Sequence, residues 1–481
     1  MFISSTSTDV METQMQIADA RTTTTATAQL QILLQQEGSS STKHQLMQAL
    51  QDAAKKVDTD TGMASPQRLG VQASSKGEKK KHAFWDTQPM LNSNDKIEKS
   101  KESYSNNAIS QPDPNWHKPI VPDKEKKELR QEPYSMPNGF EWCEVDITDA
   151  EQRTEIYELL NQNYVEDDSG CFRFDYSRDF LTWALAPPGY LKQFHLGVRS
   201  SKSNRLMALI TAVPAKVRVY GAEKHMAEVN FLCVHRKLRS KRLAPVLIKE
   251  ITRRINHTGV FQAVYTAGVK LPGSVASCRY YHRTLDARKL VEIGFTRLAP
   301  RMTMARMQKL YKLPADPMTK GLRAMTPDDV PAAHKLVAKY LEKFQLAVVL
   351  SEEEFAHLLL PRMGVVSSFV REDNGGVITD FCSYYHLHSS VLGHNQKYNT
   401  LNAAYSFYNV AETVTLTALI KDCLILAKNE GMDVFNALNL MDNDQFLEEL
   451  KFGMGGGNLQ YYIYNWVCPK MEHNDIGLVL L

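Results

Sequence analysis

Apolar positions recur at the helical period in two stretches of the chain. In the first stretch they are Ile156, Leu159, Leu160 and Tyr164, and in the second Leu336, Val337, Tyr340, Leu341 and Phe344. Positions three and four apart share one face of a helix, so each stretch predicts an amphipathic helix. A threonine stands three residues before an acid at each start, Thr148 before Glu151 and Thr326 before Asp329. This spacing is typical of a capping box with threonine as the N-cap residue.

The order of strand, helix and strand then occurs twice. L-I-K-E at 247–250 leads through Gly259 to the β-rich run V-F-Q-A-V-Y-T-A, and L-I-K-D at 419–422 leads through Gly431 to D-V-F-N-A-L. Two copies of one α/β unit, at about 140–310 and 320–481, explain this better than two unrelated domains. A chance match between common helix sequences is the alternative.

The beginning of the chain has a different composition. Residues 1–70 are rich in Thr, Gln, Ser and Ala with few aromatic residues, so we expect disorder there. The basic cluster G-E-K-K-K at 77–81 favours a solvated linker, with a ribosome or membrane contact as the alternative. A polar insert follows at 92–113, and we expect ordered structure from about Pro133. The predicted organisation is a tail (1–80), an arm (81–135), a first half (136–310) and a second half (311–481).

Composition narrows the class of protein. Hydrophobic residues make up 43% of the 481 residues and charged residues 23%, which is typical of a globular protein. A net charge of +3 does not indicate a nucleic-acid partner. The seven cysteines form no C-x-x-C pair, which predicts a reducing compartment and no metal site. We see no leader-like start and no apolar run of about 18 residues, so a cytoplasmic location is expected.

A basic loop between a strand and a helix is the best candidate site. Apolar residues at 229 and 231–234 predict the strand, and Leu247, Ile248, Ile251 and Ile255 predict the helix. Between them stand Arg236, Lys237, Arg239, Lys241 and Arg242. Helix N-termini carry unpaired N–H groups and partial positive charge, so the loop suits a pyrophosphate. A basic surface turn is the alternative, but the matching segment 409–416 has no basic residue and one acid. This asymmetry favours an enzyme with two substrates.

Several strings are together similar to the N-myristoyltransferase family. They are F-W-D-T-Q-P (84–89), R-Q-E-P-Y (130–134), N-Y-V-E-D-D (163–168), F-R-F-D-Y-S (172–177), N-F-L-C-V-H (230–235), L-R-S-K-R-L-A-P-V-L-I (238–248), F-Q-A-V-Y-T-A-G (261–268), A-A-Y-S-F-Y-N-V (403–410), D-V-F-N-A-L (433–438) and N-L-Q-Y-Y-I-Y-N-W (458–466). The loop R-S-K-R-L-A at 239–244 lacks the glycines of ordinary acetyltransferases. The resemblance implies an α/β fold of two fused, pseudo-symmetric, acetyltransferase-like halves around a saddle-shaped mixed sheet.

The resemblance also implies an acyl-CoA site and a reaction. Myristoyl-CoA would be a co-substrate, with no permanently bound cofactor, held by Phe84, Trp85, Leu232, Cys233, Val234, Arg239, Ser240, Lys241, Arg242, Leu243 and Ala244. The backbone N–H groups of Phe231 and Leu232 would form an oxyanion hole. The α-carboxylate of Leu481 would be the base that takes a proton from the attacking glycine amine. Without the resemblance, an exposed edge strand is the simpler interpretation of the apolar end, I-G-L-V-L-L.

The second substrate would be the N-terminal glycine peptide of another protein, bound by a monomeric enzyme. The implied peptide contacts are Tyr164, Asp167, Asp168, Phe172, Asn230, Thr266, Gly268, Tyr280, His282 and Ser406. Ser169, Asn439 and Gly456 stand where the family pattern favours acids, which leaves the peptide preference open. A lysine N-acyltransferase and a non-catalytic acyl-CoA-binding relative are the alternative functions.

Overall fold

The computed structural model describes residues 83–91, 117–167, 169–392 and 397–481. The predicted disordered tail, the basic cluster at 77–81, the polar insert at 92–113 and Asp168 lie outside the described residues. Residues from Lys80 onward belong to one compact unit, and the description below is confined to it.

The described residues form both helices and strands. The α-helices are α4 (Ala150–Asn163), α5 (Arg178–Leu185), α6 (Leu243–Asn256), α7 (Ala287–Glu292), α8 (Met304–Leu310), α9 (Val330–Leu341), α10 (Glu352–Leu359), α11 (Leu416–Asn429) and α12 (Asp444–Leu447). The 3-10 helices are η1 (Trp85–Thr87), η2 (Lys126–Glu128), η3 (Lys192–Phe194), η4 (Arg236–Lys241), η5 (Pro327–Asp329) and η6 (His473–Asp475). The strands are β1 (Phe140–Glu144), β2 (Phe172–Asp175), β3 (His195–Ser200), β4 (Leu206–Val219), β5 (Ala222–Val234), β6 (Ala263–Ala267), β7 (Ala276–Thr284), β8 (Leu322–Ala324), β9 (Leu346–Val348), β10 (Val366–Glu372), β11 (Ile378–His386), β12 (His388–Val391), β13 (Thr400–Leu401), β14 (Ala403–Ala411), β15 (Val434–Leu438), β16 (Gly453–Tyr464) and β17 (Ile476–Gly477).

One large mixed sheet joins two similar halves. Its main path runs β1-β3-β4-β5-β6-β16-β7-β15-β14-β11-β10-β8. When the sheet is followed inward from its two edges, β1-β3-β4-β5-β6 corresponds to β8-β10-β11-β14-β15. Each half also contributes one central strand to the other half, because β16 from the second half pairs with β6 and β7 from the first half pairs with β15. The pairs β5–β6 and β14–β15 are parallel. The predicted α/β fold of two fused halves around a mixed sheet is therefore confirmed.

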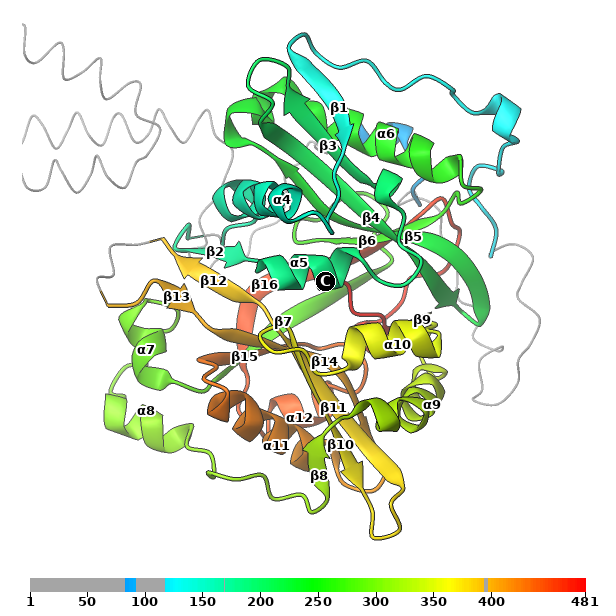
Figure 1. Ribbon diagram of the computed structural model, residues 1–481. Helices are drawn as coiled ribbons and strands as arrows, with labels where there is room; N and C mark the ends of the chain where they lie inside the picture. The colour runs from blue at the N-terminus through cyan, green and yellow to red at the C-terminus, as the bar shows by residue number, and fades with distance from the viewer. Residues whose placement is uncertain (1–82, 92–116, 168, 393–396) are drawn as a thin grey trace, which may run out of the picture. The chain divides into compact units, whose positions relative to one another are not determined.

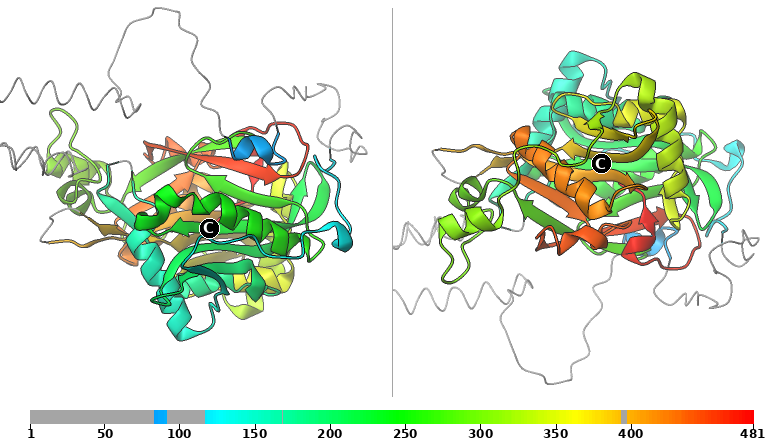
Figure 2. Two further views of the ribbon diagram at one scale, coloured as in Figure 1. Left: turned by 90° about the horizontal axis from the view of Figure 1, so that it is seen from above. Right: turned by 90° about the horizontal axis from the view of Figure 1, so that it is seen from below.

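The helices follow the same internal symmetry. The apolar sides of α6 and α11 pack into separate cores, whereas α4, α5, α9 and α10 contribute to one core shared by the two halves. That shared core also contains the last residues of the chain, Leu478, Val479 and Leu480. In Figures 1 and 2 the C-terminus accordingly lies inside the body of the unit, between the two halves.

The cap predictions fare differently in the two halves. Thr326 and Asp329 form the predicted capping box, which opens η5 just before α9. The N-cap prediction for Thr148 is wrong by one residue, because the Asp149 side chain accepts the N–H of Gln152 at the start of α4. Thr148 instead donates its hydroxyl to Asp146 Oδ1 at 2.6 Å. A short acid therefore replaces the threonine in the same capping role.

Ordered structure begins before the predicted position near Pro133. Leu129 is buried next to η2, and Met90 is buried at the end of the earlier described segment. Asn465 anchors both segments, since its N–H donates to Pro89 O and its side chain contacts the backbone of Val121. In the described part of the chain, no helix has the length and apolarity needed to span a membrane. The predicted boundaries of the four segments stay predictions.

Candidate active site

The strand β5 is interrupted by a bulge at Phe231 and Leu232. Its register with β4 shifts there, because Thr211 lies opposite Asn230 whereas Leu209 lies opposite Cys233. Two residues of β5 thus face one residue of β4, and Phe231 has a φ of 46°. A bulge takes backbone groups out of the regular ladder and is common next to active sites. The sequence pattern predicted a plain strand here, so the bulge comes from the tertiary structure.

The sheet also opens at this point. The parallel pairing of β5 with β6 covers only Ala227 with Ala263 and Glu228 with Val264. The ladder therefore ends three residues before Phe231, and the two strands part beside the bulge. The Phe231 ring is buried against Tyr164 and Tyr176, while Leu232 belongs to the core on the other face of the sheet. Packing of both side chains holds the two backbone N–H groups in fixed positions.

The basic loop after β5 forms η4 and leads directly into α6. Arg242, the N-cap residue of α6, has a φ of 54° and makes no side-chain cap to the first turn. Ser240, Lys241 and Arg242 are exposed. The first-turn N–H groups of α6, with two cationic side chains beside them, form a site with the donors and charge that a pyrophosphate needs. Leu243 is buried and anchors the helix start.

Two arginines of this loop have structural contacts. The Arg239 guanidinium donates to the carbonyl oxygens of Val234 and Asn163, at the end of α4. The Arg236 guanidinium pairs with Glu166, which also binds Arg173 at 2.6 Å. Arg239 was predicted as a phosphate ligand, and in the structure it fastens the loop to α4. The exposed Lys241 and Arg242 are the better candidates for direct contact with a phosphate.

An aromatic stack holds the segment with Phe84 and Trp85. The Trp85 ring stacks on Tyr265 at 5.8 Å, and Tyr265 stacks on Tyr462 at 4.8 Å. Phe84 packs edge-on against Trp85. This segment stands about 150 residues before the basic loop in sequence, yet it rests on β6 and β16 of the same sheet. The two tyrosines were not among the predicted site residues.

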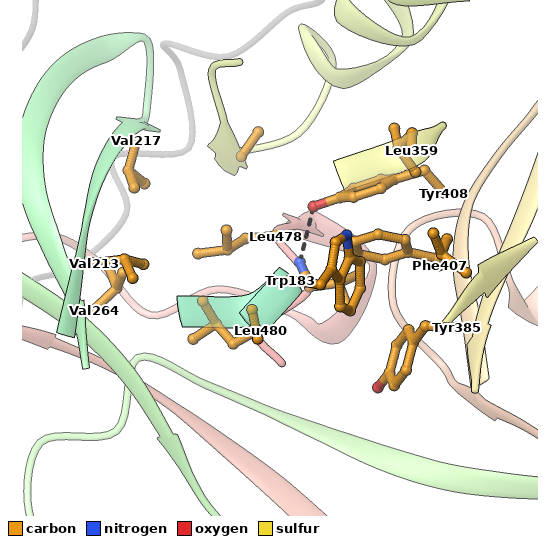
Figure 3. Close-up of a cluster of buried hydrophobic side chains, with 14 of the residues drawn as sticks. Trp183, Val213, Val217, Val264, Leu359, Tyr385, Phe407, Tyr408, Leu478 and Leu480 are labelled. Atoms are coloured by element: carbon orange, nitrogen blue, oxygen red, sulfur yellow. Dashed lines mark hydrogen bonds between the residues drawn. The ribbon is translucent and has the colours of Figure 1, made fainter. Parts of the chain in front are cut away.

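The end of the chain is held inside the shared core by two hydrogen bonds. Tyr461 donates its hydroxyl to Leu478 O at 2.9 Å, and the Val479 N–H donates to the Tyr408 hydroxyl at 3.2 Å, as drawn in Figure 3. The Leu481 backbone lies next to the Glu228 carboxyl group. Figure 3 also shows Leu478 and Leu480 among large buried side chains of both halves, including Trp183 and Phe407. An exposed edge strand, the simpler alternative, does not describe this end.

Glu228 lies on β5, three positions before Phe231. Because it is next to Leu481, the last residue of the chain lies close to the bulge. Asn230 donates its side-chain N–H to Glu228 Oε1 at 3.0 Å. Burial raises the pKa of the Glu228 carboxyl to about 7. Sequence reasoning missed Glu228. The alternation of Glu228 and Asn230 in the otherwise apolar stretch 226–234 was a usable signal, because alternate residues of a strand share a face.

The predicted peptide contacts lie on strands from both halves of the sheet. Thr266 and Gly268 are on or just after β6, Tyr280 and His282 are on β7, and Ser406 is on β14. The ring of Tyr280 contacts Tyr405 at 6.4 Å, and burial raises its pKa to about 12. Tyr164 contacts the Phe231 ring at 5.8 Å, which links the peptide residues to the bulge.

Two of the predicted peptide contacts already have partners within the protein. His282 Nδ1 lies 2.6 Å from Asn436 Oδ1, and burial lowers the pKa of this imidazole, so it is neutral at pH 7. Asp167 accepts the N–H of Phe172 at 2.7 Å and the N–H and hydroxyl of Ser169. Ser169, at a position where the family pattern favours an acid, thus donates two hydrogen bonds to the Asp167 carboxylate. A role of Asp167 in binding a basic peptide residue stays a prediction.

The cysteine beside the bulge is unsuited to act as a nucleophile. Burial raises the pKa of the Cys233 thiol to about 12, so the thiolate is scarce at neutral pH. In the described ranges no cluster of three or more His, Cys, Asp or Glu side chains could hold a metal ion. What the site offers is a pair of fixed backbone amides, a buried chain end and a cationic helix start.

Comparisons with known proteins point to one family. The model for the N-terminal domain of myristoyl-CoA:protein N-myristoyltransferase matches residues 119–278, and the model for its C-terminal domain matches residues 292–479. Glycylpeptide N-tetradecanoyltransferase 2 of Danio rerio is 50% identical over 434 residues, covering 90% of this chain and 83% of its own. The glycylpeptide N-tetradecanoyltransferase of Drosophila melanogaster is 49% identical, covering 89% and 88%. A crystal structure of Saccharomyces cerevisiae N-myristoyltransferase with bound myristoyl-CoA aligns with a TM-score of 0.77 at 37% identity, covering 84% of this chain and 100% of the other.

Proposed function

The chain belongs to the myristoyl-CoA:protein N-myristoyltransferase family, and on this premise we propose that it moves the myristoyl group of myristoyl-CoA to the N-terminal glycine amine of other proteins. The observation that carries the proposal is that the half-buried last residue, Leu481, lies next to Glu228, three positions before the Phe231–Leu232 bulge. Backbone donors and a carboxylate would thereby lie at the place where β5 and β6 part.

Binding of the acyl-CoA is assigned to the first half of the sheet. The N–H groups at the start of α6, together with Lys241 and Arg242, would hold the phosphates. Phe84 and Trp85 would pack on the coenzyme through the aromatic surface that continues to Tyr265. The acyl carbonyl would then lie at the bulge, with its oxygen facing the N–H groups of Phe231 and Leu232.

The reaction is a direct transfer in three steps, which are deprotonation of the amine, its attack on the thioester and collapse of the oxyanion. The α-carboxylate of Leu481 takes a proton from the glycine ammonium, whose pKa of about 7.7 to 8.0 leaves it mostly charged at neutral pH. The amine lone pair forms a C–N bond to the thioester carbon, and the carbonyl oxygen becomes an oxyanion held by the two N–H groups. Its collapse breaks the C–S bond, and the second amine proton neutralises the departing thiolate. No acyl-enzyme forms, in keeping with the protonated Cys233.

The peptide is assigned to the parting of the strands and to the second half. Asn230, Thr266, Tyr280 and Ser406 lie on β5, β6, β7 and β14, and Tyr164 borders the bulge. Phe172, which contacts Phe295, borders the more distant positions of the peptide. A monomeric enzyme in the cytoplasm is proposed as well, with ribosome contact through the basic cluster as an alternative to a solvated linker.

The test is release of free coenzyme A from myristoyl-CoA in the presence of a Gly-x-x-x-Ser peptide. We expect turnover with this peptide and background release with the same peptide N-acetylated, because acetylation removes the attacking lone pair. An N-acetylated peptide with one lysine, if it were the better substrate, would favour a lysine N-acyltransferase. Tight binding of myristoyl-CoA without any thiol release would favour a non-catalytic relative.

Removal of residues 1–76 is expected to leave turnover of a short peptide unchanged, because no contact with either substrate is assigned to that segment. The measurement is kcat for the full and shortened enzymes at saturating myristoyl-CoA. A decrease of about tenfold or more, equal to about 1.4 kcal/mol in the barrier, would instead give the segment a part in catalysis.

A further inference from the structure

The bulge at Phe231 has a counterpart in the second half of the sheet. There β14 takes the place of β5, and β11 takes the place of β4. The register of this second pair also shifts, so that two residues of β14, Phe407 and Tyr408, lie opposite one residue of β11, Ser383. Ile210 is the residue of β4 that faces the first bulge. A serine therefore stands in the second half where an isoleucine stands in the first.

The hydroxyl of Ser383 closes the second bulge. It accepts the backbone N–H of Tyr408 at 3.1 Å and donates to the Tyr408 carbonyl oxygen at 2.9 Å. Both residues are buried. Ile210 has no hydroxyl, so its side chain can make no such bond to the first bulge. The second bulge is therefore unsuited to hold an oxyanion, and its effect is to fix the backbone of Tyr408.

Two buried tyrosines hold one peptide group near the end of the chain. The Val479 N–H donates to the Tyr408 hydroxyl at 3.2 Å (Figure 3). The Tyr461 hydroxyl donates to Leu478 O at 2.9 Å. This N–H and this carbonyl belong to the same peptide group, and in a trans peptide they point in opposite directions. Side chains from β14 and β16 therefore hold the plane of this group from both sides.

The orientation of this plane determines where the chain ends. The side chains of Leu478 and Leu480 are buried in the shared core on either side of it. Two residues follow Val479, and they span at most about 7 Å. A turn of about 10° in the plane would therefore move the terminal α-carboxylate by about 1 Å, and a misplacement of this size can cost about 10²-fold in rate.

We propose that Tyr408 and Tyr461 are positioning residues. By holding the peptide group between Leu478 and Val479 they fix the place of the terminal α-carboxylate, and Ser383 in turn fixes the backbone of Tyr408. The inference rests on the proposed function, because the place of the carboxylate matters only if that group takes the proton from the glycine amine. The two equivalent bulges then serve different parts of one reaction. The first presents backbone donors to the thioester oxygen, and the second supports the base.

The test replaces the two tyrosines, one at a time, with phenylalanine, which keeps the buried ring and removes only the hydroxyl. We expect Tyr408→Phe and Tyr461→Phe each to lower kcat by about 10- to 100-fold, with the dissociation constant of myristoyl-CoA within about twofold of the parent. Ser383→Ala should act in the same direction, because it removes the hydroxyl that holds the Tyr408 backbone. Tyr340→Phe is the matched control. It removes a hydrogen bond of 2.8 Å to Asp442 and should keep the parental kcat.

A double-mutant cycle separates positioning from a general loosening of the core. Tyr408→Phe is combined with the addition of two glycines after Leu481, and single-turnover rates are compared for the parent, the two single variants and the combined variant. In the extended enzyme the carboxylate is already displaced, so Tyr408→Phe should lower the rate there by less than about twofold if it acts through the chain end. Melting temperatures are measured on the same preparations.

The outcomes separate this inference from the proposed function. Parental kcat in Tyr408→Phe and Tyr461→Phe, while the extension abolishes turnover, would overturn the positioning role alone. Parental kcat in the extended enzyme as well would overturn the terminal carboxylate as the base, and the inference with it. Losses that multiply in the combined variant, or that are equally large in myristoyl-CoA binding, would refute a role through the chain end. Should Ser383→Ala fail to fold, the two phenylalanine variants decide, because each keeps the buried ring.

Discussion

Adding two glycines after Leu481 is expected to lower kcat by about 10² to 10⁴, the range for loss of a general base. The added residues move the α-carboxylate away from the position that the packing and hydrogen bonds of Leu478 and Val479 give it. They also place new backbone groups in a core shared by the two halves. Binding of myristoyl-CoA should change little, because its proposed site is at α6 and at Phe84 and Trp85. Single-turnover rates and the dissociation constant of myristoyl-CoA, measured on one preparation, separate these effects.

The matched control is Leu481→Gln, which keeps the length of the chain and the α-carboxylate. Leu481 is half-buried, whereas Leu478 and Leu480 are fully buried, so a polar side chain at the last position should be tolerated. Deletion of 478–481 is a weaker test, because it also removes buried side chains at about 2 to 5 kcal/mol each. An extended enzyme with parental kcat and an unshifted melting temperature would exclude the terminal carboxylate as the base.

Replacing Lys241 and Arg242 with alanine is expected to weaken myristoyl-CoA binding by about 10²-fold or more. Charge-assisted hydrogen bonds contribute about 1.5 to 3 kcal/mol each, and both side chains are exposed beside the uncapped start of α6. The deficit should shrink at high salt, since exposed charges are screened. Titration calorimetry at two ionic strengths measures both effects. Peptide affinity at saturating myristoyl-CoA should stay close to the parent value.

Two controls define what this result means. Lys309→Ala with Lys335→Ala removes the same charge from exposed positions on α8 and α9, and it should leave binding unchanged. Arg239→Ala should behave differently from the double variant. It removes hydrogen bonds to Val234 and Asn163, so we expect a lower melting temperature together with weaker binding. If the Lys241 and Arg242 variant bound myristoyl-CoA as well as the parent, the loop would not be the phosphate site.

Local sequence determined the elements and their repetition. Most of the periodic apolar positions that predicted the two amphipathic helices are buried in the structure, with Tyr164 and Tyr340 half-buried, and the capping box at Thr326 forms as predicted. These features depend on residues three or four positions apart, which is why a sequence reveals them. The error at Thr148 is of the same local kind, because Asp149 is an equally good N-cap one residue later.

The site depends on contacts between residues that are far apart in the chain. The bulge at Phe231 requires the shifted partner strand β4, and its φ of 46° has no signal in the residue type. The pattern of apolar and polar residues also does not predict the exchange of β7 and β16 between the halves, because it does not specify which strand will be the partner. At Asp167 the sequence suggested a site that the structure does not leave open. A pair of acids indicated a cation site, but the carboxylate of Asp167 accepts hydrogen bonds from the N–H groups of Ser169 and Phe172.

The sequence by itself determined the two α/β halves, the cationic loop before a helix and, through the similar strings, the family. Only the tertiary structure decided that the apolar end of the chain enters the shared core and that Glu228 meets Leu481. The reason is physical. Helical and strand periods are set by neighbours along the chain, whereas the position of the chain end depends on packing against side chains as distant in sequence as Trp183 and Val213.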